Sequence, residues 1–283
     1  MESLQIDRLT ALGHAGRMAL FRLLVRRYPE FVPAGELADA LGVKKNTMSV
    51  YLSALVRAGL LKQRRDGRNL LYQADIDGAD DLVSYLFDDC CRGRPSLCVS
   101  HMVSEHDADA GARKMPEAHT YNALFVCTGN SARSLFAEAL LRDLGSGRFN
   151  AYSAGTHPSS HPNPIAMEML HAKGHDISPL RSKGVDEFQA DGAPIMDFVF
   201  TVCDQAANEE CPAWAGQPIT AHWGVPNPVK AKGTDAERQL AFQQAYGILK
   251  NRISLFTALH PENLERATLQ ARLDDISTQG DPK

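Results

Sequence analysis

The sequence lacks the features of a membrane, secreted or fibrous protein. No apolar run among its 283 residues approaches the roughly 18 residues that a membrane span needs. The N-terminal stretch MESLQIDRLT also lacks the positively charged and then apolar pattern of a signal peptide. The composition, 44% hydrophobic and 23% charged with a mean hydropathy of -0.27, excludes a disordered or fibrous chain. We therefore expect a globular cytoplasmic protein that has no membrane partner.

The chain has few cysteines, and the reducing conditions of the cytoplasm restrict the roles that these cysteines can have. The chain has 6 cysteines. Because the cytoplasm keeps thiols reduced, metal binding or redox catalysis is favoured over structural disulfides. A chain of this length is long enough for two domains of roughly 100 to 150 residues each, so a domain boundary is expected.

The chain as a whole has no strong excess of positive or negative charge, because its net charge is only -4. The two parts nevertheless differ: residues 1–98 carry 14 Lys and Arg against 12 Asp and Glu, whereas the remainder carries 16 against 22. Seven cations and one carboxylate lie within residues 44–68, a cluster dense enough to attract a polyanion. A solvated helix face is the alternative interpretation of this cluster.

The pattern over residues 1–98 predicts a mainly α winged helix-turn-helix domain. Gly42 and Gly59 end two helical segments, and Asp66-Gly67 supplies the positive φ angles of a tight hairpin. The expected helices span residues 9–24, 36–41, 45–58 and 80–90, and the expected strands span 60–63 and 70–73. Helix, short turn and helix, followed by a hairpin, make up the winged arrangement.

The third expected helix, residues 45–58, is the candidate DNA-reading element. Its stripe of Met48, Leu52 and Leu55 faces the core, so small polar side chains on the opposite face can reach base edges. Cations at the helix start and at the wing tip flank that face, where phosphates would run. The predicted DNA-binding residues are Lys44, Lys45, Asn46, Thr47, Ser49, Val50, Ser53, Arg65 and Arg68. Winged helices also serve as protein-interaction modules, which is the alternative.

Four stretches of the first domain carry a family resemblance: LTALGHAGRMALFRLL, ELADALGV, NTMSVYLSALVRAGLL and RRDGRNLLY. Together they resemble the ArsR/SmtB family of metalloid-responsive repressors across nearly the whole domain. The resemblance implies a homodimer, formed through this domain, that leaves operator DNA when its metal site fills. The Cys-x-Cys motif that the family often carries at the start of the second helix is absent, because that region reads VPAG at residues 32–35.

Three cysteines, Cys90, Cys91 and Cys98, lie together after the last expected helix in the stretch DDCCRGRPSLC. Some arsenic-sensing members of the family resemble this placement. Three thiolates suit a thiophilic ion, and trivalent arsenic or antimony takes three sulfurs in a pyramid. We therefore predict a trivalent arsenic or antimony site here. Zinc with His101 or His106 as a further ligand, a redox switch, and apolar packing are the alternatives.

The second part of the chain predicts an α/β domain with a parallel sheet. Residues 99–120 are small, polar and unpatterned, which marks a linker. From Tyr121, strand candidates at 124–126, 150–153 and 198–202 alternate with helical patterns from 134 and over 164–173 and 236–256. That alternation is typical of a parallel sheet covered by helices. We expect the domain to span 121–262, and 263–283 to be a polar tail with no assigned function.

A loop between the first strand and the first helix of this domain reads CTGNSARS from Cys127 to Ser134. A Cys-x5-Arg-Ser loop at this point directs helix N-terminal amides toward a bound oxyanion. The amides and Arg133 are expected to hold Cys127 as a thiolate, and Ser134 is suited to donate a hydrogen bond to the sulfur. The predicted oxyanion-binding residues are Thr128, Gly129, Asn130, Ser131, Ala132 and Arg133.

This loop resembles that of low-molecular-weight protein tyrosine phosphatases and of thioredoxin-linked arsenate reductases built on the same fold. A phosphatase needs water for its second step, whereas a reductase needs another thiol. Cys203, Cys211 and the segment His222-Trp223-Gly224 match the reductases, and the resemblance covers Tyr121 to about Leu259. It implies that Cys127 attacks arsenic, Cys203 attacks Cys127, and Cys211 attacks Cys203. The predicted catalytic residues are Cys127, Arg133, Ser134, Cys203 and Cys211. Burial of the last two thiols for packing alone is the alternative.

We expect no organic cofactor, and the resemblance raises a structural potassium ion as one interpretation of four residues. Four residues match positions that hold a structural potassium ion in some relatives: Asn130, Glu138, Ser153 and Asp197. Ordinary turn, surface and cap roles are the alternative for each of them.

Two residues depart from the family pattern. Ala132 stands where many relatives have a second loop cysteine, which removes a side reaction and leaves the mechanism intact. Asn227-Pro228 stands where the phosphatases and many reductases have an Asp-Pro acid, and an amide cannot donate a catalytic proton at neutral pH.

We interpret the sequence as an arsenic-responsive transcriptional repressor fused to an arsenate reductase, so that one chain makes arsenite and senses it. The expected partners are operator DNA, arsenate, arsenite and a reductant, which is thioredoxin, glutaredoxin or a small thiol. A DNA-binding regulator whose second domain only binds an oxyanion is one alternative. A phosphatase fused to a winged helix is the other.

Overall fold

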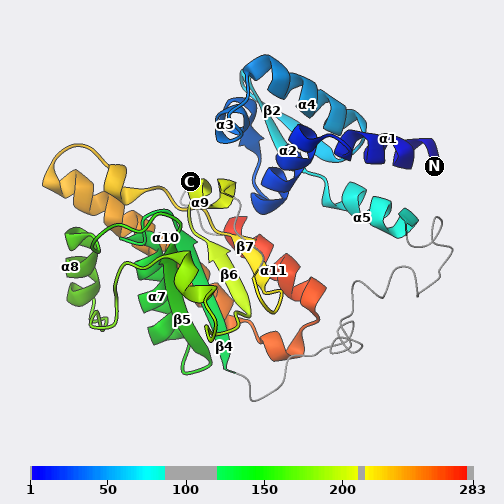
Figure 1. The fold of residues 1–283 in the computed structure, drawn as a ribbon. Coiled ribbons are helices and arrows are strands. Elements are labelled where there is room, and N and C mark those ends of the chain that lie inside the picture. The colour runs from blue at the N-terminus through cyan, green and yellow to red at the C-terminus, as the bar shows by residue number, and fades with distance from the viewer. Residues whose placement is uncertain (1, 87–119, 210–213, 279–283) are drawn as a thin grey trace. The chain divides into compact units, whose positions relative to one another are not determined.

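The computed structural model describes residues 2–86, 120–209 and 214–278 and divides into two compact units, Met1–Arg113 and Lys114–Lys283 (Figure 1). Several residues singled out from the sequence lie outside the described ranges: Cys90, Cys91, Cys98, His101, His106 and Cys211. Within those ranges, no helix is both long and apolar enough to cross a membrane.

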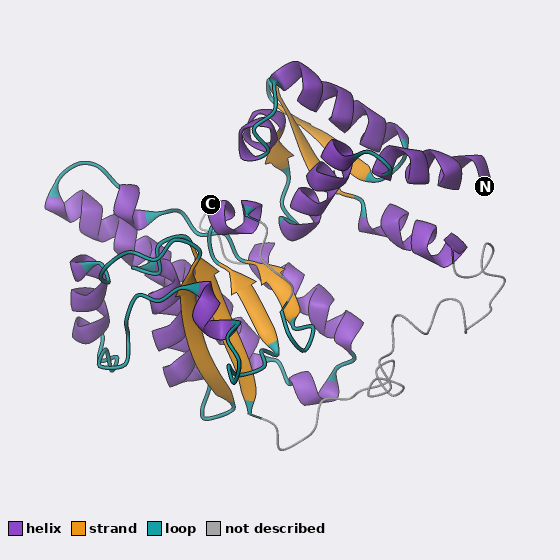
Figure 2. Cartoon of the chain, in the orientation of Figure 1, coloured by secondary structure: helices purple, strands orange, loops and turns teal. Residues whose placement is uncertain are grey.

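The first unit is a winged helix-turn-helix, which confirms the predicted fold (Figures 1 and 2). Its helices are α1 (Glu2–Leu12), α2 (Ala15–Arg26), α3 (Ala34–Ala40), α4 (Lys45–Arg57) and α5 (Ile76–Tyr85). Its antiparallel sheet has the order β1-β3-β2 and contains β1 (Val32–Pro33), β2 (Leu61–Asp66) and β3 (Asn69–Ala74). Helices α3 and α4 form the helix-turn-helix, and the hairpin of β2 and β3 forms the wing.

The apolar stripe of α4 anchors this helix in the core of the first unit. Met48, Leu52 and Leu55 are each at most 1% exposed, as expected from their helical spacing. At the tip of the wing, Gly67 has a φ of 56°, a left-handed conformation that favours glycine. The opposite face of α4 is therefore fixed toward solvent.

Two details of the first unit differ from the sequence-based expectation. The helix expected over 9–24 is two helices, and the His14 side chain caps the second by accepting a hydrogen bond from Gly16 N at 3.1 Å. Met18, one of the apolar residues in this segment, is 37% exposed. The last helix begins earlier than residue 80, because Asp75 caps it at Gly78 N.

The second unit contains a parallel four-stranded sheet with the order β5-β4-β6-β7, which confirms the predicted α/β fold (Figure 2). Its strands are β4 (Tyr121–Cys127), β5 (Phe149–Gly155), β6 (Phe198–Thr201) and β7 (Ile219–His222). Its helices are α7 (Arg133–Leu144), α8 (Pro164–Ala172), α9 (Asp204–Asn208), α10 (Asp235–Ala258) and α11 (Arg266–Thr278), with 3-10 turns η3 (Val185–Phe188), η4 (Pro228–Lys230) and η5 (Pro261–Asn263). Strand β7 was not expected, because only two of its four residues are apolar.

The two inner strands of the sheet, β4 and β6, form the core of the second unit and place Cys127 at one edge of the sheet. Strand β4 is buried almost along its whole length, as is typical of a parallel sheet covered on both faces. The Phe200 ring on β6 stacks on Phe125 and on Trp223, with centroids 5.2 and 4.1 Å apart. Because all strands are parallel, their carboxyl ends share one edge, and Cys127 lies there at the end of β4.

The chain after residue 262, which we expected to be a polar tail, forms helix α11 over Arg266–Thr278. Helix α11 packs against β7 and buries Leu269, Leu273 and Ile276, which recur at helical spacing. The Trp223 indole also donates a hydrogen bond to Leu273 O at 3.1 Å. The second unit therefore extends through α11. The few apolar residues of this helix are separated by polar ones, so the sequence shows only a weak helical pattern here.

Candidate oxyanion site and DNA-binding face

The predicted Cys-x5-Arg-Ser loop connects β4 to α7, and its backbone is held from outside. Four loop carbonyls accept backbone hydrogen bonds of 2.8 to 3.0 Å from the segment 156–163, namely those of Cys127, Thr128, Gly129 and Ser131. A fifth, that of Asn130, accepts from the Ser182 hydroxyl at 2.8 Å. Because the N–H and C=O of a trans peptide point in opposite directions, these contacts turn the loop amides toward its centre. Such a ring of amides is a binding site for an anion.

Two residues allow the loop to turn this tightly. Asn130 has a φ of 42°, in the left-handed region that asparagine tolerates better than most residues. A Cβ on Gly155 would lie 2.7 Å from Thr128 O and 3.0 Å from Asn130 N. Only glycine therefore lets the end of β5 approach the loop so closely.

Two donors surround the sulfur of Cys127, which is 2% exposed. The Asn130 N–H donates to Sγ at 3.2 Å, and the Ser134 hydroxyl lies 3.0 Å from it. The side-chain amide of Asn130 donates a hydrogen bond to Ser134 Oγ at 2.8 Å. The hydroxyl hydrogen of Ser134 is therefore free to point at the sulfur of Cys127. This is the contact that the sequence predicts for Ser134.

Opposing effects act on the pKa of the Cys127 thiol, which we expect to react as a thiolate. Burial raises the pKa of the Cys127 thiol above its ordinary value, and the neighbouring Cys203 thiol raises it further. The hydrogen bond with Ser134 and the charge of Arg133 lower the pKa but do not reverse the shift. Burial therefore works against the thiolate form of Cys127, and the contacts with Ser134 and Arg133 work in its favour.

The Arg133 side chain is 8% exposed and is oriented by one backbone contact. Its NH1 group donates to Val225 O at 2.9 Å, directly after the His-Trp-Gly segment. That bond fixes the plane of the guanidinium, whose fork of donors fits two oxygens of a tetrahedral anion.

The structure brings Cys203 to the oxyanion loop. Its Sγ lies 3.4 Å from the hydroxyl of Thr128 and accepts a hydrogen bond from Ala206 N at 3.4 Å, so it caps α9. Both Cys127 and Cys203 are buried free thiols. The His222 ring holds the start of α9, with Nε2 3.4 Å from Asp204 Oδ1.

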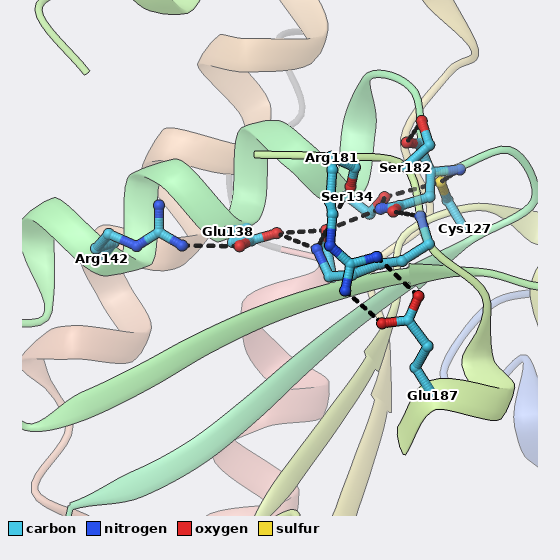
Figure 3. Close-up of polar contacts among 10 residues, drawn as sticks. Cys127, Ser134, Glu138, Arg142, Arg181, Ser182 and Glu187 are labelled. Atoms are coloured by element: carbon cyan, nitrogen blue, oxygen red, sulfur yellow. Dashed lines mark hydrogen bonds and ion pairs between the residues drawn. The ribbon is translucent and has the colours of Figure 1, made fainter. Parts of the chain in front are cut away.

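A buried polar network connects the loop to α7, and Figure 3 shows the polar contacts that radiate from Glu138. The Asn130 amide donates to Ser153 Oγ at 2.8 Å, and Ser153 donates to Glu138 Oε2 at 2.5 Å. The Lys183 ammonium lies 3.1 Å from the same carboxylate oxygen, and Arg142 NH2 lies 2.7 Å from the other. Glu138 and Lys183 are 3% and 7% exposed, so their charges are paired inside the protein.

This network bears on the four residues that match a potassium site. Asn130, Glu138 and Ser153 lie together, but Asp197 does not join them. Its carboxylate accepts from Asn122 N at 2.8 Å near the start of β4, at the opposite end of the strand from Cys127. The Lys183 ammonium, 3.3 Å from Ser153 Oγ, already supplies a positive charge between Ser153 and Glu138.

Two functional groups escaped the sequence analysis. Lys183 is one cation in a polar stretch without a recognisable pattern, so nothing marked it as a buried partner of Glu138. The Val225 carbonyl acts through its backbone, which the side-chain identity does not reveal. Asn227, by contrast, was singled out, and its Oδ1 accepts from Val229 N at 3.2 Å, so it caps η4.

The first unit presents the predicted DNA-binding residues on its surface. On α4, Asn46, Ser49, Val50 and Ser53 share one exposed face, and Val50 is 64% exposed. All the other predicted positions are exposed as well except Thr47, which is half-buried. Lys62, a further member of the cation cluster, is instead engaged by Asp75 and Asp77, each at 3.0 Å. The surface therefore keeps cations at the helix start and at the wing.

Comparison with known proteins assigns both units. Residues 122–268 match the family model described as low molecular weight phosphotyrosine protein phosphatase, and residues 12–64 match a helix-turn-helix domain model. An arsenate reductase of Shouchella clausii is 37% identical over 132 residues, which are 47% of this chain and 91% of that protein. A glutaredoxin arsenate reductase of Synechocystis sp. is 32% identical over 130 residues, 46% of this chain and 91% of that protein. A solved structure of an arsenate reductase in its reduced state is 30% identical, covers 49% of this chain and 97% of that chain, and has a TM-score of 0.39.

The match to the phosphatase family spans more than half of the chain and contains the whole oxyanion loop. The helix-turn-helix match contains α3 and α4. With a helix-turn-helix domain ahead of its catalytic fold, the chain belongs to the low molecular weight phosphotyrosine protein phosphatase family, alongside the members named arsenate reductase.

Proposed function

We propose that the second unit reduces arsenate to arsenite by a relay of thiols, and that the first unit is an arsenic-responsive repressor. One observation carries the reductase assignment: the Cys203 thiol lies 3.4 Å from the hydroxyl of Thr128 in the oxyanion loop. A phosphatase needs one thiol and a water molecule, whereas a reductase needs a second thiol beside the first. The names of the relatives support the same substrate.

The relay balances as a two-electron reduction. Cys127 attacks arsenate, its thiol proton and an arsenate hydroxyl group leave together as water, and a sulfur–arsenic bond forms. Cys203 then attacks Cys127 Sγ, the sulfur–arsenic bond breaks, and its electron pair stays on arsenic, which leaves as arsenite. Cys211 next attacks Cys203 and releases Cys127 as a thiol. A dithiol reductant such as thioredoxin, or glutaredoxin with a small thiol, reduces the remaining disulfide.

The loop contacts support the first step. The inward amides and the Arg133 guanidinium stabilise the negative oxygens of the oxyanion. The Ser134 hydroxyl stabilises Cys127 Sγ as a thiolate when its proton leaves, and again when Cys203 displaces it from arsenic. Arsenate thus meets a preorganised site.

Arsenate-dependent NADPH oxidation tests this function with a thioredoxin system and, in parallel, with glutaredoxin and glutathione. We expect turnover by the native protein with at least one of them, and a loss of at least about 10³-fold for Cys203→Ser. As a control, inorganic phosphate should still protect Cys127 of this variant from alkylation, because the loop is unchanged. Rapid aryl phosphate hydrolysis that survives Cys203→Ser, without arsenate turnover, would return the unit to the phosphatases.

The repressor assignment is supported by the exposed polar face of α4 and the helix-turn-helix match. A homodimer is supported by apolar side chains left exposed on α1 and α5, two helices that contact each other. These side chains are Leu4, Ile6, Leu9, Ile76 and Val83, each between 38% and 53% exposed. A second copy of the chain would cover them.

Release from DNA is proposed to follow binding of trivalent arsenic or antimony to Cys90, Cys91 and Cys98. The reason for proposing this site is chemical, because three thiols close together in the sequence match the three-sulfur coordination of these ions. Fluorescence anisotropy with operator DNA, titrated with arsenite, measures the response. If the triple serine variant dissociates at the same arsenite concentration as the native protein, the sensor lies elsewhere.

A further inference from the structure

Helix α11 covers the open edge of the parallel sheet. Strand β7 is an edge strand, and side chains from α11 bind backbone carbonyls along it. Arg266 donates to Gln217 O just before the strand, and Gln270 donates to Thr220 O at 2.9 Å. The family match ends at residue 268, so most of α11 lies beyond the part of the chain that the family shares.

Arg252, on α10, joins α11 to the segment that follows β7. Its side chain is 2% exposed, with NH1 donating to Gly224 O and NH2 donating to Ser277 O, both at 3.0 Å. Ser277 lies in the last turn of α11, where the helix dipole favours a cation. The indole of Trp223 makes a second link by donating to Leu273 O. Residues 223 and 224 are thereby tied to α11 at two points.

The next residue in the chain holds the oxyanion-binding arginine. Val225 O accepts the hydrogen bond from Arg133 NH1 at 2.9 Å, and Val225 itself is 3% exposed. The peptide between Gly224 and Val225 is held by two hydrogen bonds, one from Arg252 NH1 to Gly224 O at 3.0 Å and one from Val225 N to Val202 O at 3.3 Å. The direction of the Val225 carbonyl follows from the position of that peptide, and Arg252 supplies its only side-chain contact among the described residues. A continuous path of hydrogen bonds and one short backbone segment therefore leads from α11 through Arg252 to Arg133.

We propose that Arg252 is a positioning residue that, together with α11, sets the orientation of Arg133 and so the affinity of the loop for a tetrahedral oxyanion. This inference rests on the oxyanion-binding step of the proposed function but not on the reduction of arsenate. A guanidinium must be aligned with two oxygens to bind both, so a small shift of Val225 weakens binding without unfolding the unit.

The test uses the full chain and inorganic phosphate as the probe. Iodoacetamide labels Cys127, mass spectrometry of the peptide measures the rate, and the phosphate concentration that halves the rate reports affinity. Arg252→Met keeps an apolar stem and removes both hydrogen bonds, and we expect the half-protecting concentration to rise about tenfold. Arg252→Lys keeps the charge and can reach one carbonyl, so we expect a rise of only about threefold.

Leu269→Ala is the matched control. Leu269 is 1% exposed on α11 and its truncation weakens the same packing, but its side chain takes no part in the hydrogen bonds from Arg252 to Gly224 and Ser277. We expect its phosphate protection to change less than about twofold, within the ordinary spread of a distant substitution. Equal shifts in Leu269→Ala and Arg252→Met would reduce Arg252 to a general stabilising role and overturn the proposal.

Three further outcomes decide the remaining cases. If Arg252→Met does not fold, as judged by tryptophan fluorescence, then unaltered protection in Arg252→Lys and in Trp223→Phe overturns the proposal. Normal phosphate protection in the native protein without arsenate turnover would reject the reductase function while leaving this inference standing. Protection that is normal in native and variant proteins alike would reject the inference alone.

Discussion

The oxyanion loop and the face of α4 are both candidate sites for phosphate-like anions, and they are built in opposite ways. In the loop, five carbonyls are engaged from outside, and Asn130 and Ser134 are completely buried. On α4, the predicted reading residues are almost all exposed, and Ser49 only donates back to Lys45 O of its own helix at 3.0 Å. A small oxyanion needs donors that are already aligned. DNA instead brings its own extended surface, which exposed side chains can meet.

This contrast determines how substitutions should act. A change in the loop removes one member of a buried, mutually bonded set, so its cost includes the groups that it leaves unsatisfied. A change on the DNA face removes one contact among several exposed ones, so its effect should be smaller and close to additive.

Cys127→Ser should abolish arsenate turnover and leave DNA binding intact. Serine lacks a thiolate, so we expect a loss of at least about 10⁴-fold in NADPH oxidation. The DNA affinity and its response to arsenite, measured by anisotropy, should stay within about twofold of native, because the winged helix has a core of its own. A parallel loss of operator binding would instead favour a regulator whose second domain only senses an oxyanion.

Lys183→Met should strongly destabilise the second unit. It leaves the Glu138 carboxylate buried with less positive charge around it, which costs about 3 kcal/mol. Both tryptophans of the chain lie in this unit, so fluorescence during urea unfolding reports on it. Potassium chloride should restore stability better than sodium chloride at equal ionic strength, since a weakly hydrated cation can replace the ammonium.

Arg181→Met is the matched control for Lys183→Met. It also removes a cation, but one that is 60% exposed and pairs with Glu187 at the surface (Figure 3). Its cost should be below about 1 kcal/mol. An equal loss of unfolding free energy in the two variants would show that the buried network contributes no more to stability than a surface ion pair.

The fold could be predicted from the sequence because its signals are local and repeated. Helical spacing placed Met48, Leu52 and Leu55 in the core, and the Cys-x5-Arg-Ser spacing identified the loop between β4 and α7. The sequence could not show that Lys183 enters the core beside Glu138, because a lysine is ordinarily exposed. Nor could it show that α11 belongs to the second unit, because three apolar residues in a polar stretch bury little surface until β7 is in place.

Replacement of both wing arginines should weaken operator binding by a factor of about ten. Arg65→Ala with Arg68→Ala removes two cations per chain, and each is expected to lower the slope of log affinity against log salt by about 1. Lys62→Ala is the control, because Lys62 is held by Asp75 and Asp77 rather than offered to phosphate. A larger effect for Lys62→Ala than for the wing pair would place the DNA on another face.

Alkylation of Cys127 should accelerate with pH. Because burial raises the pKa of this thiol, the fraction of reactive thiolate, and with it the rate of labelling by iodoacetamide, should increase as the pH is raised above 7. Ser134→Ala removes a contact that lowers the pKa, so the variant should react more slowly at each pH. A rate that is already constant above pH 7 would mean that the loop holds a thiolate after all.

Asn227 is the residue that best separates a reductase from a phosphatase. Aryl phosphate cleavage needs an acid to protonate the leaving oxygen and then a base to activate water, and one carboxylate serves both steps. Aspartate keeps an oxygen that can accept from Val229 N, so Asn227→Asp should preserve the cap of η4. General acid–base help is worth about 10²- to 10⁴-fold in an evolved site, and we expect a gain of at least about tenfold in para-nitrophenyl phosphate hydrolysis here. Arsenate turnover should change less, because Cys203 rather than activated water resolves the adduct. Asn227→Ala, which offers neither acid nor cap, should show no gain, and an equal gain in both variants would mean that Asn227 lies away from the leaving group.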